Sequence, residues 1–334
     1  MCRYLLHRLL AILPTLLGVA VVVFTLIRLI PGDPAEVMLG GFATPERVAA
    51  QRRDLGLDRP LVVQFGTWAK EIGTGNLGRS IMSQAPVARE IWSRFPATLE
   101  LTLLSTCFAL AVGITLGIIS ATAHNTRLDL LATIVSVLGM SIPIFWLGLM
   151  LLYVLGIWWR VLPISGRLDL AIPLQQITGL ILVDSLIHHN WAALADGLKH
   201  LVLPGFTLAV VPIATISRMT RTNMVEVLRQ DYISVARAKG LTERVVLTRH
   251  ALKNALIPVL TVAGTRFGMQ LAGAVLVEVV YGWPGIGRLT FDAIQKRDYP
   301  LIQGAILFIA GLFVLINLLT DLLYAVVDPR ISFE

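Results

Sequence analysis

Few residues in this sequence have the types and the spacing that enzymatic chemistry requires. The sequence contains neither a GxxxxGK(S/T) phosphate loop nor an HExxH motif, so we do not expect the chain itself to hydrolyse ATP. Its six histidines are scattered, and Cys2 and Cys107 form neither a disulfide nor a ligand cluster. No apolar segment supplies the facing nucleophile and base of an intramembrane protease. The sequence therefore predicts no enzyme, no metal site and no cofactor in this chain.

Three charged residues lie within or near long apolar segments: Arg266, Glu278 and Asp321. Such residues normally face a bundle interior or an aqueous path. Arg266 lies between Gly264 and Gly268, a GxxxG pair that favours close helix packing. Arg266 could make a structural contact with Asp321 or a helix-end carbonyl, or it could lie beside a translocation path and bind a substrate carboxylate. Glu278 and Asp321 are nearer the membrane faces, which favours snorkelling or helix end-capping.

A polar, basic insert at residues 231–253 separates two apolar segments. Tyr232, Ala236 and Gly240 are four residues apart, so they share one face of a predicted helix, and the two small residues would let another protein approach closely. Gly240 suits a left-handed C-cap, and Thr242 suits the N-cap of a second helix. The insert therefore predicts a helix, a glycine break and a second helix, where a membrane channel could meet a soluble protein.

The elements that must position these residues are membrane helices. The composition is 56% hydrophobic and only 15% charged, with a mean hydropathy of +0.76, which is far from soluble usage. A span needs roughly 20 apolar residues. Six windows approach that length: residues 9–27, 101–123, 130–159, 201–217, 254–281 and 300–320.

Two of these windows need comment. The first is longer than the roughly 7–15 apolar residues of a signal peptide, so we interpret it as a retained anchor. The third exceeds one span, and Pro143 is predicted to kink or end a helix within it.

The distribution of cations predicts the orientation of these helices. Residues 218–253 hold eight Lys/Arg against three Asp/Glu, whereas residues 31–100 hold eight of each and residues 160–199 hold three of each. We therefore expect residues 218–253, Arg127, Arg330 and both termini to be cytoplasmic. The net charge of +7 follows from this topology, so no nucleic-acid partner is expected.

The predicted organisation is an amino-terminal transmembrane helix at residues 1–30, an external segment at 31–100, and a membrane core at 101–334 with about five spans and a cytoplasmic loop at 218–253. The external segment carries glycine-punctuated loops around an amphipathic stretch near Trp68. It could order the outer helix ends, or it could dock a soluble partner through residues such as Asp58 and Arg79.

The insert resembles the EAA loop of ATP-binding-cassette importer permeases, and nearly the whole chain resembles the peptide and nickel branch of that family. The matching segments are IPGDP at 30–34, FPATLE at 95–100, SIPIFW at 141–146, LPISGR at 162–167, DYISVARAKGL at 231–241, HALKNALIP at 250–258, GWPG at 282–285, DLLY at 321–324 and DPR at 328–330.

This resemblance implies an all-α integral membrane protein of the bacterial cytoplasmic membrane, similar to type I importer permeases. It implies a second homologous permease, two cytoplasmic ATPases that bind ATP and Mg²⁺, and a periplasmic or lipoprotein substrate-binding protein. In such systems the loop fits a groove on the ATPase. Here Ala236 and Gly240 would enter the groove, Tyr232, Arg237 and Lys239 would contact its walls, and Ala238 and Leu241 complete the loop. Ser234, Val235 and Lys253 depart from the general importer pattern.

The resemblance is greatest to dipeptide permeases, which implies a subunit that forms half of a translocation pathway for dipeptides or short peptides. Nickel, glutathione, D-amino-acid dipeptides, heme and antimicrobial peptides stay open as cargoes. A secondary transporter is an alternative, although we detect none of the internal repeats it would be expected to show. A structural assembly factor would not explain the insert.

Overall fold

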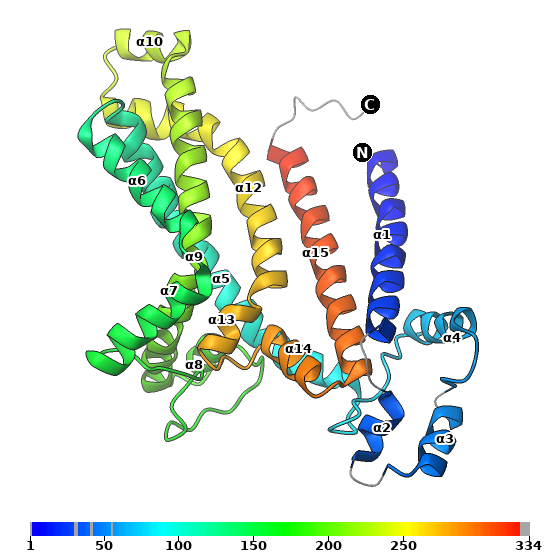
Figure 1. Cartoon of the computed structure of the whole chain (residues 1–334). Coiled ribbons are helices and arrows are strands. Elements are labelled where there is room, and N and C mark those ends of the chain that lie inside the picture. The colour runs from blue at the N-terminus through cyan, green and yellow to red at the C-terminus, as the bar shows by residue number, and fades with distance from the viewer. Residues whose placement is uncertain (1, 30–32, 41–42, 55, 328–334) are drawn as a thin grey trace.

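The structure, a computed structural model, describes residues 2–29, 33–40, 43–54 and 56–327. Every regular element within these ranges is a helix, and an isolated bridge joins Arg79 to Pro86. Long helices run through the molecule, with shorter helices near both ends (Figure 1). The described part of the chain is therefore all-α, as predicted.

Five described helices are long and apolar enough to span a membrane, and a sixth span results if one bent pair is counted. The helices are α1 (Cys2–Leu29), α5 (Val87–Thr122), α9 (Trp191–Leu228), α12 (Leu252–Gly273) and α15 (Tyr299–Val327). α12 continues from α11 (Glu243–Val245) and the π-helical segment η3 (Val246–Ala251). This count agrees with the prediction of about six spans.

The bent pair is the third predicted window. α6 (Arg127–Ser141) ends just before Pro143, which is the N-cap of α7 (Ile144–Leu151), and α7 continues into the π-helical segment η2 (Leu152–Trp158). The two halves differ in direction by 101°. Proline lacks a backbone N–H and disfavours helical backbone at the residue before it, so the prediction that Pro143 ends a helix is confirmed.

The fifth predicted window, residues 254–281, is wrong at its carboxyl end. α12 stops at Gly273, and the next residues form a separate short helix, α13 (Val275–Val280). Hydropathy does not detect this break because the sequence VLVEVV is nearly as apolar as the span before it. α13 leads toward α14 (Ile286–Gln295).

The most extensive helix packing is between α5 and α9, and glycines allow the two helices to approach closely. A Cβ atom added to Gly117 would lie 2.5 Å from Cβ of Thr220 and 2.7 Å from the carbonyl oxygen of Ser217. A Cβ atom added to Gly113 would lie 2.9 Å from Ile216. Small residues of this kind allow two membrane helices to approach closely.

The short helices separate into two ends. α10 (Asp231–Ala238) lies at one end, together with the start of α1 and the end of α15 (Figure 1). The opposite end carries α2 (Pro34–Leu39), α3 (Pro45–Asp54) and α4 (Leu61–Gly73), and α8 (Ile181–Ile187) and α14 lie toward it. Residues 30–32 and 328–330 of the matching segments, including Arg330, lie outside the described residues.

Candidate functional site

The insert, residues 231–253, begins as two helices separated by a glycine. α10 ends at Ala238, and Gly240 follows with a φ of +77°, a conformation that residues with a Cβ rarely adopt. Arg237 closes the turn because its guanidinium donates two hydrogen bonds to the Glu243 carboxylate, at 2.7 and 3.1 Å. Thr242 is at the N-cap position of α11, although its side chain makes no capping bond. The predicted helix, glycine break and helix are confirmed.

α10 packs onto the chain itself. Ile233 is fully buried and Ala236 is 6% exposed, and both belong to an apolar cluster with Met224 of α9 and Val246 of η3. The side-chain amide of Asn254 donates to the Tyr232 hydroxyl at 2.8 Å and so adds a polar link to α12. These contacts fasten α10 to the ends of α9 and α12.

The opposite face of the insert presents the other predicted coupling residues to solvent. Tyr232 and Leu241 are exposed, as are Arg237, Ala238, Lys239 and Gly240. Ala236 differs from our expectation, because it faces the interior of its own chain. The spacing of three between Ile233 and Ala236 defines an inward helix face, and the helix ends before Gly240 can share it. Contact between the exposed residues and a partner stays a prediction.

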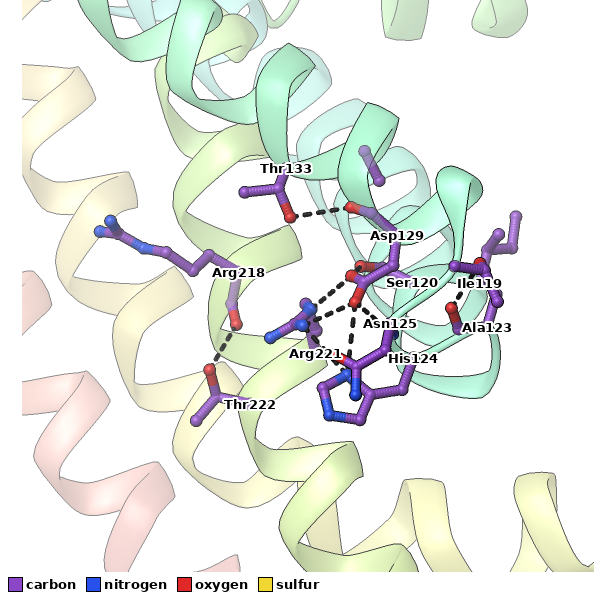
Figure 2. Close-up of polar contacts among 12 residues, drawn as sticks. Ile119, Ser120, Ala123, His124, Asn125, Asp129, Thr133, Arg218, Arg221 and Thr222 are labelled. Carbon is purple, nitrogen blue, oxygen red and sulfur yellow. Dashed lines mark hydrogen bonds and ion pairs between the residues drawn. The ribbon is translucent and has the colours of Figure 1, made fainter.

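An ion pair between α6 and α9 borders this apolar cluster (Figure 2). Arg221 donates to both carboxylate oxygens of Asp129, at 2.6 and 2.7 Å, and also to Nδ1 of His124 at 3.1 Å. Asp129 is 4% exposed and accepts further hydrogen bonds from the Ser120 hydroxyl and the Asn125 backbone. Bidentate pairs of this kind fix geometry strongly, so the start of α6 is held on α9.

Three of the matching segments meet on the side of the molecule away from α10. Arg167, from residues 162–167, donates to the carboxylate of Glu100, from residues 95–100, at 2.5 Å. The guanidinium of Arg167 also lies 5.6 Å from the ring centroid of Trp283, from residues 282–285. The indole of Trp283 in turn donates to the carbonyl of Ala97 at 2.8 Å. These segments therefore form one structural cluster that joins the start of the second span to two loops.

Glu278 lies in the same region and is fully buried. It accepts hydrogen bonds from the Thr98 hydroxyl at 2.6 Å and from the backbone of Arg288, in the first turn of α14, at 2.9 Å. Burial raises the pKa of Glu278 to about 7, and these hydrogen bonds oppose the shift. Snorkelling is therefore wrong for Glu278, whereas the predicted end-capping is confirmed, with α14 as the helix that is capped.

The GxxxG pair of α12 packs against α15. A Cβ atom added to Gly264 would lie 2.5 Å from Thr320, and one added to Gly268 would lie 3.3 Å from Ile316. Arg266 is two residues from each glycine, so it projects from the other side of α12, where it is partly buried. Both interpretations of Arg266 stay predictions.

The two predicted docking residues, Asp58 and Arg79, are exposed near the end of the molecule that carries α2 to α4. The loop that holds Arg79 is fixed to α15, because the hydroxyl of Ser80 donates to Asp298 at 2.5 Å. The backbone amide of Ile81 donates to the same carboxylate at 3.1 Å. The loop therefore does order a helix end, and its docking role stays a prediction.

The sequence alone did not identify Asp129, Arg221 or Asp298 as structural residues. Asp129 lies in the first turn of α6, and Asp298 directly precedes α15, so both are acidic residues near the start of a helix. An acidic residue near a helix start is a weak signal for end-capping. Arg221 was counted only as one positive charge of a basic segment.

Two family models match this chain. The model described as "Binding-protein-dependent transport system inner membrane component" matches residues 113–333, and its amino-terminal companion model matches residues 1–102. Together they cover most of the chain.

Curated relatives match over the full length of both chains. A "Dipeptide transport system permease protein" of Alkalihalophilus pseudofirmus is 46% identical over 333 residues, and a "Di/tripeptide transport system permease protein" of Pseudomonas aeruginosa is 45% identical over 335 residues. A "Glutathione transport system permease protein" of Salmonella typhimurium is 40% identical over 334 residues. Each of the three alignments covers 100% of this chain and 100% of the relative. The chain is a multi-pass membrane permease that belongs to the family of binding-protein-dependent transport system inner membrane components.

Proposed function

We propose that this chain forms half of the translocation pathway of an ATP-driven importer of dipeptides or short peptides. The observation that supports this most is the full-length similarity, at 45–46% identity, to permeases whose names specify dipeptides or di- and tripeptides. Glutathione, the cargo named for a relative at 40% identity, is itself a tripeptide. A peptide cargo is therefore common to all three.

The insert is proposed to couple this pathway to a cytoplasmic ATPase that holds ATP and Mg²⁺. A coupling contact must differ between two states of the complex, because a contact that is equal in both shifts no equilibrium. The exposed residues Tyr232, Lys239 and Leu241 would contact the ATPase groove, while Ile233 and Ala236 hold α10 on the permease. Movement of the ATPase would then move α9 and α12 with it.

The proposed complex contains this chain, a second homologous permease, two ATPases and a substrate-binding protein outside the membrane. The proposed orientation places α10 and both termini in the cytoplasm, in agreement with the excess of cations in residues 218–253. The start of α1 and the end of α15 lie on the α10 side of the molecule, which is consistent with this orientation (Figure 1). Asp58 and Arg79 would then face the substrate-binding protein.

The test is uptake of a labelled dipeptide by cells that lack this chain, with its partner subunits retained. The intact chain should restore uptake. A variant in which the exposed residues Tyr232, Lys239 and Leu241 are replaced, so that the insert cannot contact the ATPase, should not restore it. Labelled glutathione and nickel are measured in the same cells. Unchanged dipeptide uptake after deletion would refute the dipeptide proposal, and loss of glutathione or nickel uptake alone would assign that cargo instead.

Glutathione is the second candidate cargo, because a full-length relative carries that name. Competition separates the two candidates. Excess unlabelled dipeptide should abolish labelled dipeptide uptake if dipeptides are the cargo, whereas glutathione should be the stronger competitor if it is the cargo.

A further inference from the structure

A cavity of about 560 Å³ lies at the end of the membrane helices opposite α10. It is bounded by the end of α1, the start of α15, and the loops before and after α4. Polar residues from these different elements line it, among them Arg28, Arg52, Arg79, Tyr299 and Gln303. This cavity belongs neither to the insert nor to the cluster around Trp283.

The cavity carries an excess of positive charge. Arg52 is neutralised by Asp33, whose carboxylate lies 2.7 Å away. Arg28 donates to the neutral amide oxygen of Gln64, at 3.0 and 3.1 Å, and stacks on the ring of Phe24. Arg79 donates to the backbone carbonyl of Gln84 at 3.1 Å. Two guanidinium groups, those of Arg28 and Arg79, therefore lack a carboxylate partner in the described part of the chain, which favours an anionic ligand.

Tyr299 supplies a second and independent sign of a ligand. This residue lines the cavity and is only 6% exposed. Within the described residues its buried hydroxyl has no hydrogen-bond partner. A buried hydroxyl without a partner is unfavourable, so a bound oxygen acceptor at this position would remove the cost.

The surroundings place the cavity at the level of a membrane interface. The apolar span of α1 ends at Leu29, next to Arg28. Phe24 packs against Phe65 and Trp68 of α4, with ring centroids 5.2 and 5.4 Å apart, and aromatic residues gather at such interfaces.

α4 also presents apolar side chains outward, since Leu61 and Val62 are 61% and 82% exposed. A short helix with such a face is suited to lie in the plane of the interface. Leu61 and Ile27 form an apolar wall of the cavity beside its arginines. A ligand that is anionic at one end and apolar at the other matches these walls better than a small soluble anion does.

We propose that the cavity binds the phosphate headgroup of an anionic phospholipid from the leaflet opposite α10. The guanidinium groups of Arg28 and Arg79 and the hydroxyl of Tyr299 donate hydrogen bonds to the phosphate oxygens. The acyl chains lie along α1, where Val22 and Leu26 are 54% and 56% exposed. This inference assigns Arg79 to the lipid, which leaves Asp58 for the substrate-binding protein. It requires only that the helices span a membrane, so it does not depend on the cargo proposed above.

The test is native mass spectrometry of the purified importer complex with phosphatidylglycerol or phosphatidylcholine added in detergent. The unmodified complex should retain phosphatidylglycerol in preference to phosphatidylcholine. Arg79→Gln and Tyr299→Phe should each reduce this retention about tenfold, which corresponds to about 1.4 kcal/mol. Both variants avoid Arg28, whose contacts with Phe24 and Gln64 also support the fold.

Matched controls use the same substitutions elsewhere. Arg53→Gln alters the neighbour of Arg52 on α3, and Tyr153→Phe alters an exposed tyrosine of η2. Neither residue lines the cavity, so both variants should retain the lipid normally. Equal retention of the two lipids, or equal losses in the control variants, would overturn the proposal. Displacement of the lipid by inorganic phosphate or by a dipeptide would instead assign the cavity to a free anion or to a peptide.

Discussion

The ion pair between Asp129 and Arg221 leads to a quantitative prediction, because it fastens α6 to α9 beside the cluster that supports α10 (Figure 2). In Arg221→Gln the Asp129 carboxylate loses both short hydrogen bonds from the guanidinium. It keeps the Ser120 hydroxyl, the Asn125 amide and the 3.3 Å contact with Nδ1 of His124, but it stays buried without the permanent positive charge of a guanidinium.

The expected cost follows from this geometry. Removing one partner of a buried ion pair typically costs about 3–5 kcal/mol. The side chain of Arg221 is 28% exposed, so water partly reaches the site and the lower end of this range applies. A loss of about 3 kcal/mol should lower the apparent melting temperature by ~4 °C in a chain of 334 residues.

The assay is thermal unfolding of the purified complex, combined with peptide uptake per ATP hydrolysed in vesicles. Arg221→Gln should lower both quantities. Asp129→Asn combined with Arg221→Gln removes both charges and should be more stable than Arg221→Gln alone. Arg218→Gln is the matched control, since Arg218 is exposed about one turn earlier on α9. A melting temperature of Arg221→Gln equal to that of Arg218→Gln would refute the reasoning.

Three further predictions concern single residues. Gly240→Val forces a branched side chain into a left-handed conformation at a cost of about 1–2 kcal/mol, and it should reduce peptide uptake per ATP hydrolysed without preventing membrane insertion. Gly240→Asn should have a smaller effect on coupling. Gly75→Val, at a φ of +82° in the external segment, is the control and should leave coupling unchanged. Normal coupling in Gly240→Val would contradict the assignment of the insert. Since the pKa of Glu278 rises from 4.5 to about 7 on burial, the folded state binds the extra proton, and stability should fall as pH rises from about 4.5 to about 7. Glu278→Gln should flatten this pH profile in thermal unfolding, whereas Glu71→Gln, at an exposed position, should keep it. Gly117→Ala should lower stability by about 1–3 kcal/mol because its Cβ would collide with α9. Gly66→Ala, in open space on α4, should raise stability by about 0.5–1 kcal/mol. A higher melting temperature for Gly117→Ala than for Gly66→Ala would disprove the packing argument.

Features that depend on local backbone chemistry were predictable from the sequence. Pro143 ends a helix because it lacks an N–H, and Gly240 ends α10 because it tolerates a positive φ. The packing of Gly264 and Gly268 on another helix was predictable because two glycines four residues apart leave one face of a helix without side chains. Each of these signals lies within a few residues of the feature that it predicts.

Features that depend on distant partners were not predictable in the same way. Asp129 and Arg221 are 92 positions apart, and Glu100 and Arg167 are 67 apart, so nothing local pairs them. Ala236 shows a related limit. We expected Tyr232, Ala236 and Gly240 to share one helix face, but Tyr232 is exposed, Ala236 is buried and the helix ends at Ala238. Only the packing of Ile233 on α9 and η3 decides which side of that helix faces inward.

The continuity of α9 has a mechanical consequence. Its 38 residues correspond to about 57 Å of helix, which is roughly twice the thickness of the hydrocarbon layer. A tilt of about 5° would therefore displace one end relative to the other by about 5 Å. Because α10 is fastened near one end and α8 packs near the other, a small rotation imposed on one membrane face becomes a shift of several ångströms at the opposite face. Pro204 and Pro212 lie along this helix, at the positions where such a movement could be converted into bending instead.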